Sequence, residues 1–188
     1  DACVFDERTR SWRAPAAAYR EVFADLHVRQ ARGELQLVDQ ARAYGEVGCV
    51  LRSTRKPRPY QSEAVAAWQR DGRRGQVVLP TGAGKSYVAH LAIAAVDRST
   101  LVVVPTLDLM GQWYDGLLAA FDIDEVGLVG GGYHEVMPLT VTTYDSFHIH
   151  IPRYGDRFGL IVFDEVHHLG GQTYLQACDA ALAPFRLG

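Results

Sequence analysis

The residues with the clearest chemical potential lie in one short stretch, Leu79-Pro80-Thr81-Gly82-Ala83-Gly84-Lys85-Ser86, between an apolar run and a helical pattern. Glycine lets main-chain N–H groups approach phosphate oxygens closely, and a helix N-terminus adds partial positive charge. The Lys85 ammonium can reach the outer phosphates of a nucleotide, and the Ser86 hydroxyl can bind Mg²⁺. The full pattern has glycine at position 79, so an ordinary turn before a helix remains an alternative for this stretch alone. The predicted phosphate contacts are Pro80, Thr81, Gly82, Ala83, Gly84, Lys85 and Ser86.

A second candidate group is a pair of carboxylates, Asp164 and Glu165, directly after an apolar run of four residues. The first acid after a buried strand can hold Mg²⁺ through water, and its neighbour can orient or deprotonate an attacking water. Mg²⁺ needs few protein oxygens, so Ser86 and Asp164 suffice. The alternative is that the pair only caps the next helix. Its coincidence with the Gly-Lys-Ser loop favours nucleotide hydrolysis, with Lys85, Asp164 and Glu165 as catalytic residues.

Helical and apolar patterns alternate along the chain from residue 61 onward. Runs that are apolar on both faces indicate buried parallel strands, with the helices as crossover connections. The predicted fold class is therefore α/β, a three-layer P-loop domain with a parallel sheet. Its ligand is expected beyond the carboxyl ends of the strands, where Pro80, Pro105 and Asp164 are placed. The expected helices are 61–70, 85–96, 107–121 and 172–183, and the expected strands are 76–79, 101–104, 126–129, 139–142 and 160–163.

Residues 1–56 are predicted to be a small accessory segment before the α/β domain at 57–188. Apolar residues at helical spacing predict an amphipathic helix over 15–26, and 35–38 is predicted to be a short strand. Two prolines in the stretch 57–59 force extended backbone and mark the entrance to the domain.

Charge is unevenly distributed between the two ends of the chain. Residues 1–60 hold 11 Lys and Arg against 8 Asp and Glu, whereas residues 61–188 hold 8 against 14. The densest basic stretch, 52–58, could contact nucleic-acid phosphates or be a solvated linker, and the sequence leaves both open.

The composition is that of a globular domain. Its 188 residues are 48% hydrophobic and 22% charged, enough for one sizeable core. No apolar stretch approaches a membrane span, and the first residues do not resemble a signal peptide. Because the first residue is not Met, we expect a fragment. Three widely spaced cysteines argue for a reducing compartment, so we expect a cytoplasmic protein with no membrane partner.

Four motifs together resemble a known family. The stretch Asp164-Glu165-Val166-His167 is similar to the DExH box of superfamily 2 helicases, whose phosphate loop often lacks its first glycine. The stretch Arg58-Pro59-Tyr60-Gln61 resembles the adenine-sensing motif, and 103–109 and 142–146 resemble motifs Ia and Ib. The combination is most similar to XPB-type DNA repair helicases of archaea and bacteria, which implies a RecA-like motor domain. The resemblance is strong over 57–188 and weaker before it.

The resemblance implies a role for each matching residue. The Gln61 amide would contact the adenine edge, with Arg58 and Tyr60 also in the nucleotide site. His167 would couple the nucleotide state to DNA contact. The backbone of a DNA strand would be held by Pro105, Thr106, Thr143, Tyr144 and Asp145.

The same resemblance implies a DNA-dependent ATPase that uses ATP and Mg²⁺. It would move along single-stranded or forked duplex DNA in the 3′→5′ sense and open the duplex in DNA repair, with a nuclease or a repair complex as partner. The chain stops just before motif III and lacks a second motor domain with its arginine finger, which can be worth ~10³ to 10⁵ in rate. We therefore expect this chain alone to bind nucleotide weakly and to hydrolyse it poorly.

Three other functions stay open. A restriction-type ATPase would move along duplex DNA without separating its strands. A non-catalytic nucleic-acid-binding module would keep the fold, although such a module usually loses one of Lys85, Ser86, Asp164 and Glu165. A P-loop ATPase with no nucleic-acid substrate is disfavoured by Gln61 and by the two DNA-contact motifs.

Several residues have a structural interpretation beside the functional one. Trp68 and Trp113 lie at inward helical positions and are predicted to be core, whereas Trp12, between two nearby arginines, is the better candidate for an exposed contact. The hydroxyls of Thr106 and Thr143 fit either helix caps or donors to phosphate, and the motif context favours phosphate.

Overall fold

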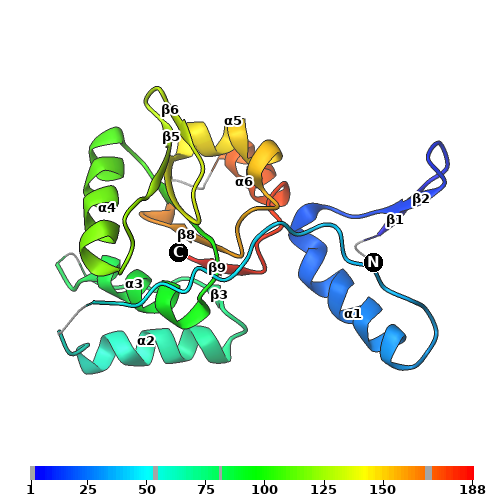
Figure 1. The fold of residues 1–188 in the computed structure, drawn as a ribbon, viewed down its shortest axis with the longest axis horizontal. Helices are drawn as coiled ribbons and strands as arrows, with labels where there is room; N and C mark the ends of the chain where they lie inside the picture. Colours follow the sequence, from blue (N-terminus) through cyan, green and yellow to red (C-terminus); the bar gives the residue numbers. More distant parts are fainter. Residues whose placement is uncertain (1–2, 53–54, 81, 168–170) are drawn as a thin grey trace.

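The structure, a computed structural model, has a seven-stranded sheet at its centre (Figure 1). It describes residues 3–52, 55–80, 82–167 and 171–188. The strand order is β3-β9-β8-β4-β7-β5-β6, and every neighbouring pair is parallel except β5 and β6. The strands are β3 (Arg74–Gly75), β4 (Thr100–Val104), β5 (Gly127–Gly130), β6 (Tyr133–Glu135), β7 (Leu139–Thr143), β8 (Leu160–Phe163) and β9 (Phe185–Leu187).

Helices cover both faces of the sheet, and the central strand β4 shows why. All five of its residues are buried. Val102 and Val104 pack in a core with α2, α3 and α4, whereas Leu101 and Val103 pack on the other face with α5 and α6. The predicted three-layer α/β fold is therefore confirmed. The helices of these layers are α2 (Pro59–Arg70), α3 (Lys85–Val96), α4 (Leu107–Ala120), α5 (Tyr144–Tyr154) and α6 (Gln172–Asp179).

Most predicted elements are confirmed to within a few residues, and α3 and β8 have the predicted bounds. The predicted helix 172–183 is too long, because alanines favour a helix beyond Asp179 whereas the chain there turns toward β9. Helix α5 was not predicted, although Tyr144, Phe147 and Ile151 form a buried stripe at helical spacing; its segment carries a proline, Pro152, which argues against a helix. The short strands β6 and β9 were also missed.

The strand predicted at 76–79 is wrong in its position, because β3 ends at Gly75. The following backbone still runs beside β9, since the Val77 N–H donates to the Gly188 carbonyl at 2.7 Å. Val78, however, is 89% exposed. Among the described strands, β3 lies at the edge of the sheet with β9 as its neighbour on one side. An apolar run predicted a strand buried on both faces, whereas residues 76–79 alternate between exposed and half-buried positions, so only one face of this segment is covered.

The N-terminal residues form a hairpin and a helix that project from the sheet domain (Figure 1). The hairpin pairs β1 (Val4–Asp6) with β2 (Ser11–Arg13), and a 3₁₀ turn, η1 (Ala16–Ala18), leads into α1 (Tyr19–Ala31). A helix is confirmed where 15–26 was predicted, but it begins at Tyr19 and continues to Ala31, and no residue of it is buried. The strand predicted at 35–38 is wrong, because these residues have no regular secondary structure and no described strand pairs with them.

Residues 43–52 lie against the sheet domain although they precede the predicted boundary. Cys49 is buried in the core that α3 and α4 share with the sheet. The Arg52 N–H donates to the Ala120 carbonyl at 2.7 Å, and Leu51 bridges Phe121. The division after residue 56 stays a proposal, and these contacts attach the segment before it to the domain. Within the described part of the chain, no helix combines the length and the apolar character needed to cross a bilayer.

Candidate active site

The phosphate loop ends at Gly84, the residue before the first turn of α3. Its φ of 80° is the left-handed conformation that glycine adopts most readily. A Cβ at this position would lie 2.7 Å from the Gln61 amide nitrogen. Both facts require glycine at position 84. Lys85 and Ser86 are then the first residues of α3, where main-chain N–H groups have no partner within the helix and can bind a phosphate. The predicted contact Thr81 lies outside the described residues.

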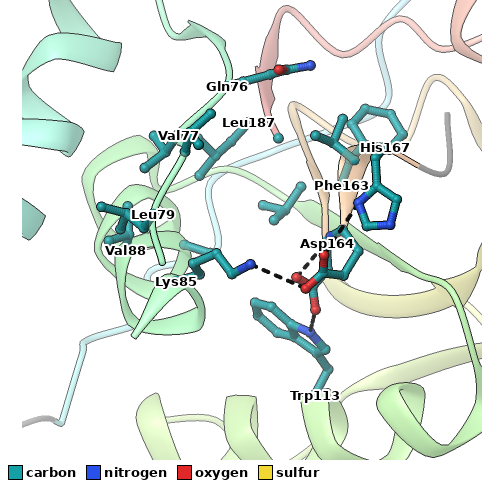
Figure 2. Close-up of a pocket in the computed structure, with 16 residues that line it drawn as sticks. Gln76, Val77, Leu79, Lys85, Val88, Trp113, Phe163, Asp164, His167 and Leu187 are labelled. Atoms are coloured by element: carbon teal, nitrogen blue, oxygen red, sulfur yellow. Dashed lines mark hydrogen bonds and ion pairs between the residues drawn. The ribbon is translucent and has the colours of Figure 1, made fainter. Parts of the chain in front are cut away.

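Lys85 and Asp164 face one another across a cleft at the carboxyl edge of the sheet (Figure 2). The cleft has a volume of about 310 Å³, and Glu165 also lines it. The Lys85 Nζ lies 3.3 Å from Glu165 Oε1. Their side chains are 37% and 39% exposed, so solvent and ligands reach the pair. Glu165 Oε2 also lies 3.5 Å from Nδ1 of His167, which adds the predicted coupling residue to the cleft. A lysine has three donors, so a phosphate can join or replace the carboxylate as its partner.

The turn after β8 holds both acids in fixed positions. Glu165 has a φ of 51°, an uncommon value for a residue with a side chain, and such backbone strain concentrates at functional sites. The Asp164 carboxylate accepts two hydrogen bonds, from the Glu165 N–H at 3.1 Å on Oδ1 and from Trp113 Nε1 at 2.7 Å on Oδ2. Both oxygens of this acid are therefore oriented by the protein.

Gln61 is fully buried beneath the phosphate loop. Its Nε2 donates to the carbonyls of Ala83 at 2.9 Å and Gly84 at 3.3 Å, and its Oε1 accepts the Arg58 N–H at 3.0 Å. The Tyr60 hydroxyl also donates to the Ala83 carbonyl, at 2.9 Å. The residues predicted to recognise adenine thus hold the phosphate loop here, and the Gln61 amide would have to exchange partners to contact a base.

The predicted DNA contacts follow β4 and β7, which are neighbours in the sheet and end at the same edge as β8. Thr106 accepts the Leu109 N–H at 3.2 Å, and Thr143 accepts the Ser146 N–H at 3.3 Å. Both threonines therefore cap the helices that follow them. This is the structural alternative to a phosphate contact, and the phosphate contact of these residues and of Pro105 stays a prediction.

Tyr144 is a buried residue, and its predicted DNA contact stays a prediction. It is 3% exposed, and its hydroxyl donates to the Asp164 carbonyl at 3.0 Å. Burial, together with the nearby Asp164 charge, raises the pKa of the Tyr144 hydroxyl. Its side chain supports the turn after β8 from inside. Asp145 is exposed, and it accepts a hydrogen bond from the Tyr174 hydroxyl at 2.8 Å.

The oxygen donors at this edge suit Mg²⁺, which prefers hydroxyl, carboxylate and phosphate oxygens together with water. Ser86 presents an exposed hydroxyl on the first turn of α3, and Asp164 presents its carboxylate from the end of β8. Ser86 is not among the residues that line the cleft. Within the described ranges, no cluster of three His, Cys, Asp or Glu could hold a metal. The donor set fits an ion that arrives with the nucleotide phosphates.

The functional residue that sequence reasoning missed is Trp113. It is 5% exposed, so its predicted place in the core is confirmed, but it also donates to Asp164. The sequence gives only a general indication of this contact, because any buried indole N–H needs a hydrogen-bond acceptor. The particular acceptor lies 51 residues away along the chain. Local spacing does not identify such a pair.

A parallel sheet with a Gly-Lys-Ser loop and an Asp-Glu pair at its carboxyl edge defines the class, a P-loop NTPase domain. The chain belongs to the family described as "Type III restriction enzyme, res subunit", which matches residues 54–188.

Curated relatives refine this family. The chain is 44% identical over 131 residues to the "DNA 3'-5' translocase XPB2" of Sulfurisphaera tokodaii, a match that covers 70% of this chain and 29% of that protein. It is 37% identical over 132 residues to the "DNA 3'-5' helicase XPB" of Kineococcus radiotolerans, covering 65% of this chain and 24% of that protein. The predicted membership of the XPB-type superfamily 2 helicases is confirmed. The chain spans less than a third of the length of these relatives.

The fold also matches a solved structure. The UvsW helicase from bacteriophage T4 aligns with 98% of this chain and 72% of its own, at a TM-score of 0.61 and 19% sequence identity. The likeness shows a shared RecA-like helicase fold.

Proposed function

We propose that the protein carrying this chain is a DNA-dependent ATPase that moves along DNA in the 3′→5′ sense, and that this chain supplies its ATP-binding half. The observation that carries the proposal is the Lys85–Glu165 ion pair beside Asp164 in an open cleft at the carboxyl edge of the sheet. The names of the curated relatives, a DNA 3'-5' translocase and a DNA 3'-5' helicase, support DNA as the substrate.

The ion pair suggests how binding prepares hydrolysis. Without nucleotide, Lys85 and Glu165 neutralise each other across the cleft. Phosphate oxygens of ATP on the loop draw the Lys85 ammonium away, which frees the Glu165 carboxylate to orient the attacking water and accept its proton. Mg²⁺, held by Ser86 and through water by Asp164, would offset the negative charge of the phosphates.

The DNA strand would lie along the edge where β4 and β7 end, beside the nucleotide cleft. The candidates for contact with its backbone are Pro105, Thr106, Thr143, Tyr144 and Asp145. Single-stranded or forked DNA is the substrate class. His167 follows β8 and contacts Glu165, so a movement of His167 on DNA binding would directly change the contacts of the catalytic carboxylate. A nuclease or a repair complex is the proposed partner class. The cytoplasm is the proposed location, supported by the free thiols of Cys3, Cys49 and Cys178.

Displacement assays on the full-length protein test this function. A duplex with a 3′ single-stranded tail should lose its complementary strand when ATP and Mg²⁺ are present, and a 5′-tailed duplex should not. Displacement of a third strand from a triplex without separation of the duplex would instead favour a duplex translocase of restriction type. DNA binding without either activity would favour a non-catalytic module.

A further inference from the structure

Trp113 lies in the middle of α4 and directs its indole nitrogen at the metal-binding acid. In Figure 2 the indole lies below Asp164, and the hydrogen bond between them is drawn. The Nε1–Oδ2 distance of 2.7 Å is short for an N–H donor, as expected when the acceptor is a carboxylate. Trp113 itself takes no part in binding the nucleotide phosphates or in activating water.

The indole is held on its far side by the helix that starts with Lys85. His90, one turn further along α3, packs edge-on against Trp113 with ring centroids 5.6 Å apart and an interplanar angle of 87°. His90 also packs against Phe121 at the end of α4. Trp113 therefore fills the space between the phosphate-loop helix and the end of β8, and its ring has little freedom to turn away from Asp164.

The hydrogen bond leaves room for a cation. Each carboxylate oxygen offers about two lone-pair positions. On Asp164, the indole takes one at Oδ2 and the Glu165 N–H takes one at Oδ1, so each oxygen keeps one position that can face metal-bound water. An indole N–H donates only and cannot bind the metal itself.

We propose that Trp113 is a positioning residue for Mg²⁺–nucleotide binding, because its N–H fixes the orientation of the Asp164 carboxylate. This inference rests on the proposed ATPase function of the same site. Groups that orient a metal-binding carboxylate typically change metal affinity by 10- to 100-fold when they are removed. The role of Trp113 is indirect, since it acts through Asp164.

The test uses the full-length protein and a fluorescent ATP analogue. Trp113→Phe removes the N–H and keeps a buried ring. We expect the Mg²⁺ concentration for half-maximal nucleotide binding to rise about tenfold, while affinity for the analogue in EDTA stays within about twofold of wild type. Trp68→Phe is the matched control, because Trp68 is equally buried and also donates one hydrogen bond, to the Arg186 carbonyl at 2.9 Å, away from the cleft. Its Mg²⁺ midpoint should not change.

Different results would contradict the positioning role of Trp113 and the proposed ATPase function. An unchanged Mg²⁺ midpoint in Trp113→Phe, with a lowered melting temperature like that of Trp68→Phe, would overturn the positioning role. Wild-type protein that binds no nucleotide at any Mg²⁺ concentration would overturn the proposed function itself. If Trp113→Phe does not fold, a tryptophan analogue with sulfur in place of the indole N–H can be introduced at position 113 alone. This analogue keeps the shape of the ring but removes the donor, so it must still raise the Mg²⁺ concentration for half-maximal nucleotide binding.

Discussion

At the scale of single residues, the Gln61 amide is the clearest case of a group with two candidate partners. The structure shows it buried against the phosphate loop, whereas the resemblance assigns it to adenine. We expect Gln61→Ala to weaken binding of tripolyphosphate, which has no base, as well as binding of ATP. The reason is that loss of two or three buried hydrogen bonds loosens the loop, by about 1–2 kcal/mol or roughly tenfold in affinity.

Equilibrium titration of the full-length protein with both ligands measures the effect. Any loss for ATP beyond the loss for tripolyphosphate gives the adenine contribution. Gln69→Ala, on the exposed side of the same helix, is the control and should change neither affinity. Unaltered tripolyphosphate binding in Gln61→Ala would show that the amide does not hold the loop.

His90 predicts a dependence of stability on pH. Burial lowers the pKa of His90 to about 4, and its Nε2 has no hydrogen-bond partner among the described residues. In the unfolded chain the pKa of a histidine is about 6.5, so between pH 6.5 and 4 the unfolded state binds a proton at His90 that the folded state does not bind. The free energy of unfolding therefore falls as the pH drops through this range. Between pH 7 and 5 the loss should be about 2 kcal/mol.

Urea denaturation at the two pH values checks this prediction. His90→Phe, which can keep the ring contacts with Trp113 and Phe121, should lose most of the pH-dependent difference. Replacement of an exposed histidine, His148→Asn, should leave it unchanged. An equal difference in wild type and His90→Phe would assign the pH dependence to other groups.

The site residues that the sequence predicts are those set by short local patterns. Lys85 and Ser86 are set by a loop motif, and Asp164 and Glu165 by the end of an apolar run, so their place at one sheet edge follows from the parallel fold. Other features depend on the packed structure, so no local pattern contains them. They are the indole contact of Trp113 with Asp164, the loop contacts of Gln61, the left-handed backbone of Glu165 and the burial of Tyr144.

At the scale of elements, Arg186 links strand β9 to the end of helix α6. Its Nη2 donates to the carbonyl of Cys178 in the last turn of α6 and to the carbonyl of Ala181 just beyond the helix, each at 3.0 Å. Burial lowers the pKa of Arg186. We expect Arg186→Met to reduce the free energy of unfolding by about 2 kcal/mol, because the Ala181 carbonyl loses its side-chain donor and the Cys178 carbonyl keeps only backbone donors such as the Ala181 N–H.

Urea denaturation of the variant beside Arg70→Met measures this contribution. Arg70 is an exposed arginine in the last turn of α2, so its removal should cost less than about 0.5 kcal/mol. Equal stability of the two variants would show that the cap at the end of α6 contributes nothing.

The elements that were predicted well have long apolar or helical patterns, as in α3, α4, β4 and β8. The missed strands β6 and β9 are short, the misplaced strand lies at an edge of the sheet, and the missed helix α5 contains a proline. The apolar run after β3 predicted a buried strand, and only the sheet order shows that it has an edge position. Helix α5 begins with the side-chain cap of Thr143, whose hydroxyl was predicted to bind phosphate.

At the scale of the whole molecule, the N-terminal segment is attached to the sheet domain at several points. Arg20 donates to the Gly72 carbonyl, and Arg74 Nη2 donates to the Ala17 carbonyl at 3.2 Å. Residues 43–52 then cross the domain and bury Cys49 in its core. Composition and prolines predicted a division into two parts. These polar and single-residue contacts carry no periodic signal, so the sequence could not show how closely the parts are joined.

The sheet places the nucleotide cleft and the candidate DNA edge side by side at the carboxyl ends of β8, β4 and β7. From this arrangement we infer that DNA stimulates ATP hydrolysis and that this hydrolysis depends on Glu165. The most direct measurement is ATP turnover by the full-length protein, with and without DNA, beside its Glu165→Gln variant. We predict that DNA stimulates wild-type turnover, and that the variant binds ATP within about twofold of wild type but hydrolyses it at least ~10²-fold more slowly. Turnover that is indifferent to DNA, or that survives in Glu165→Gln, would contradict the account.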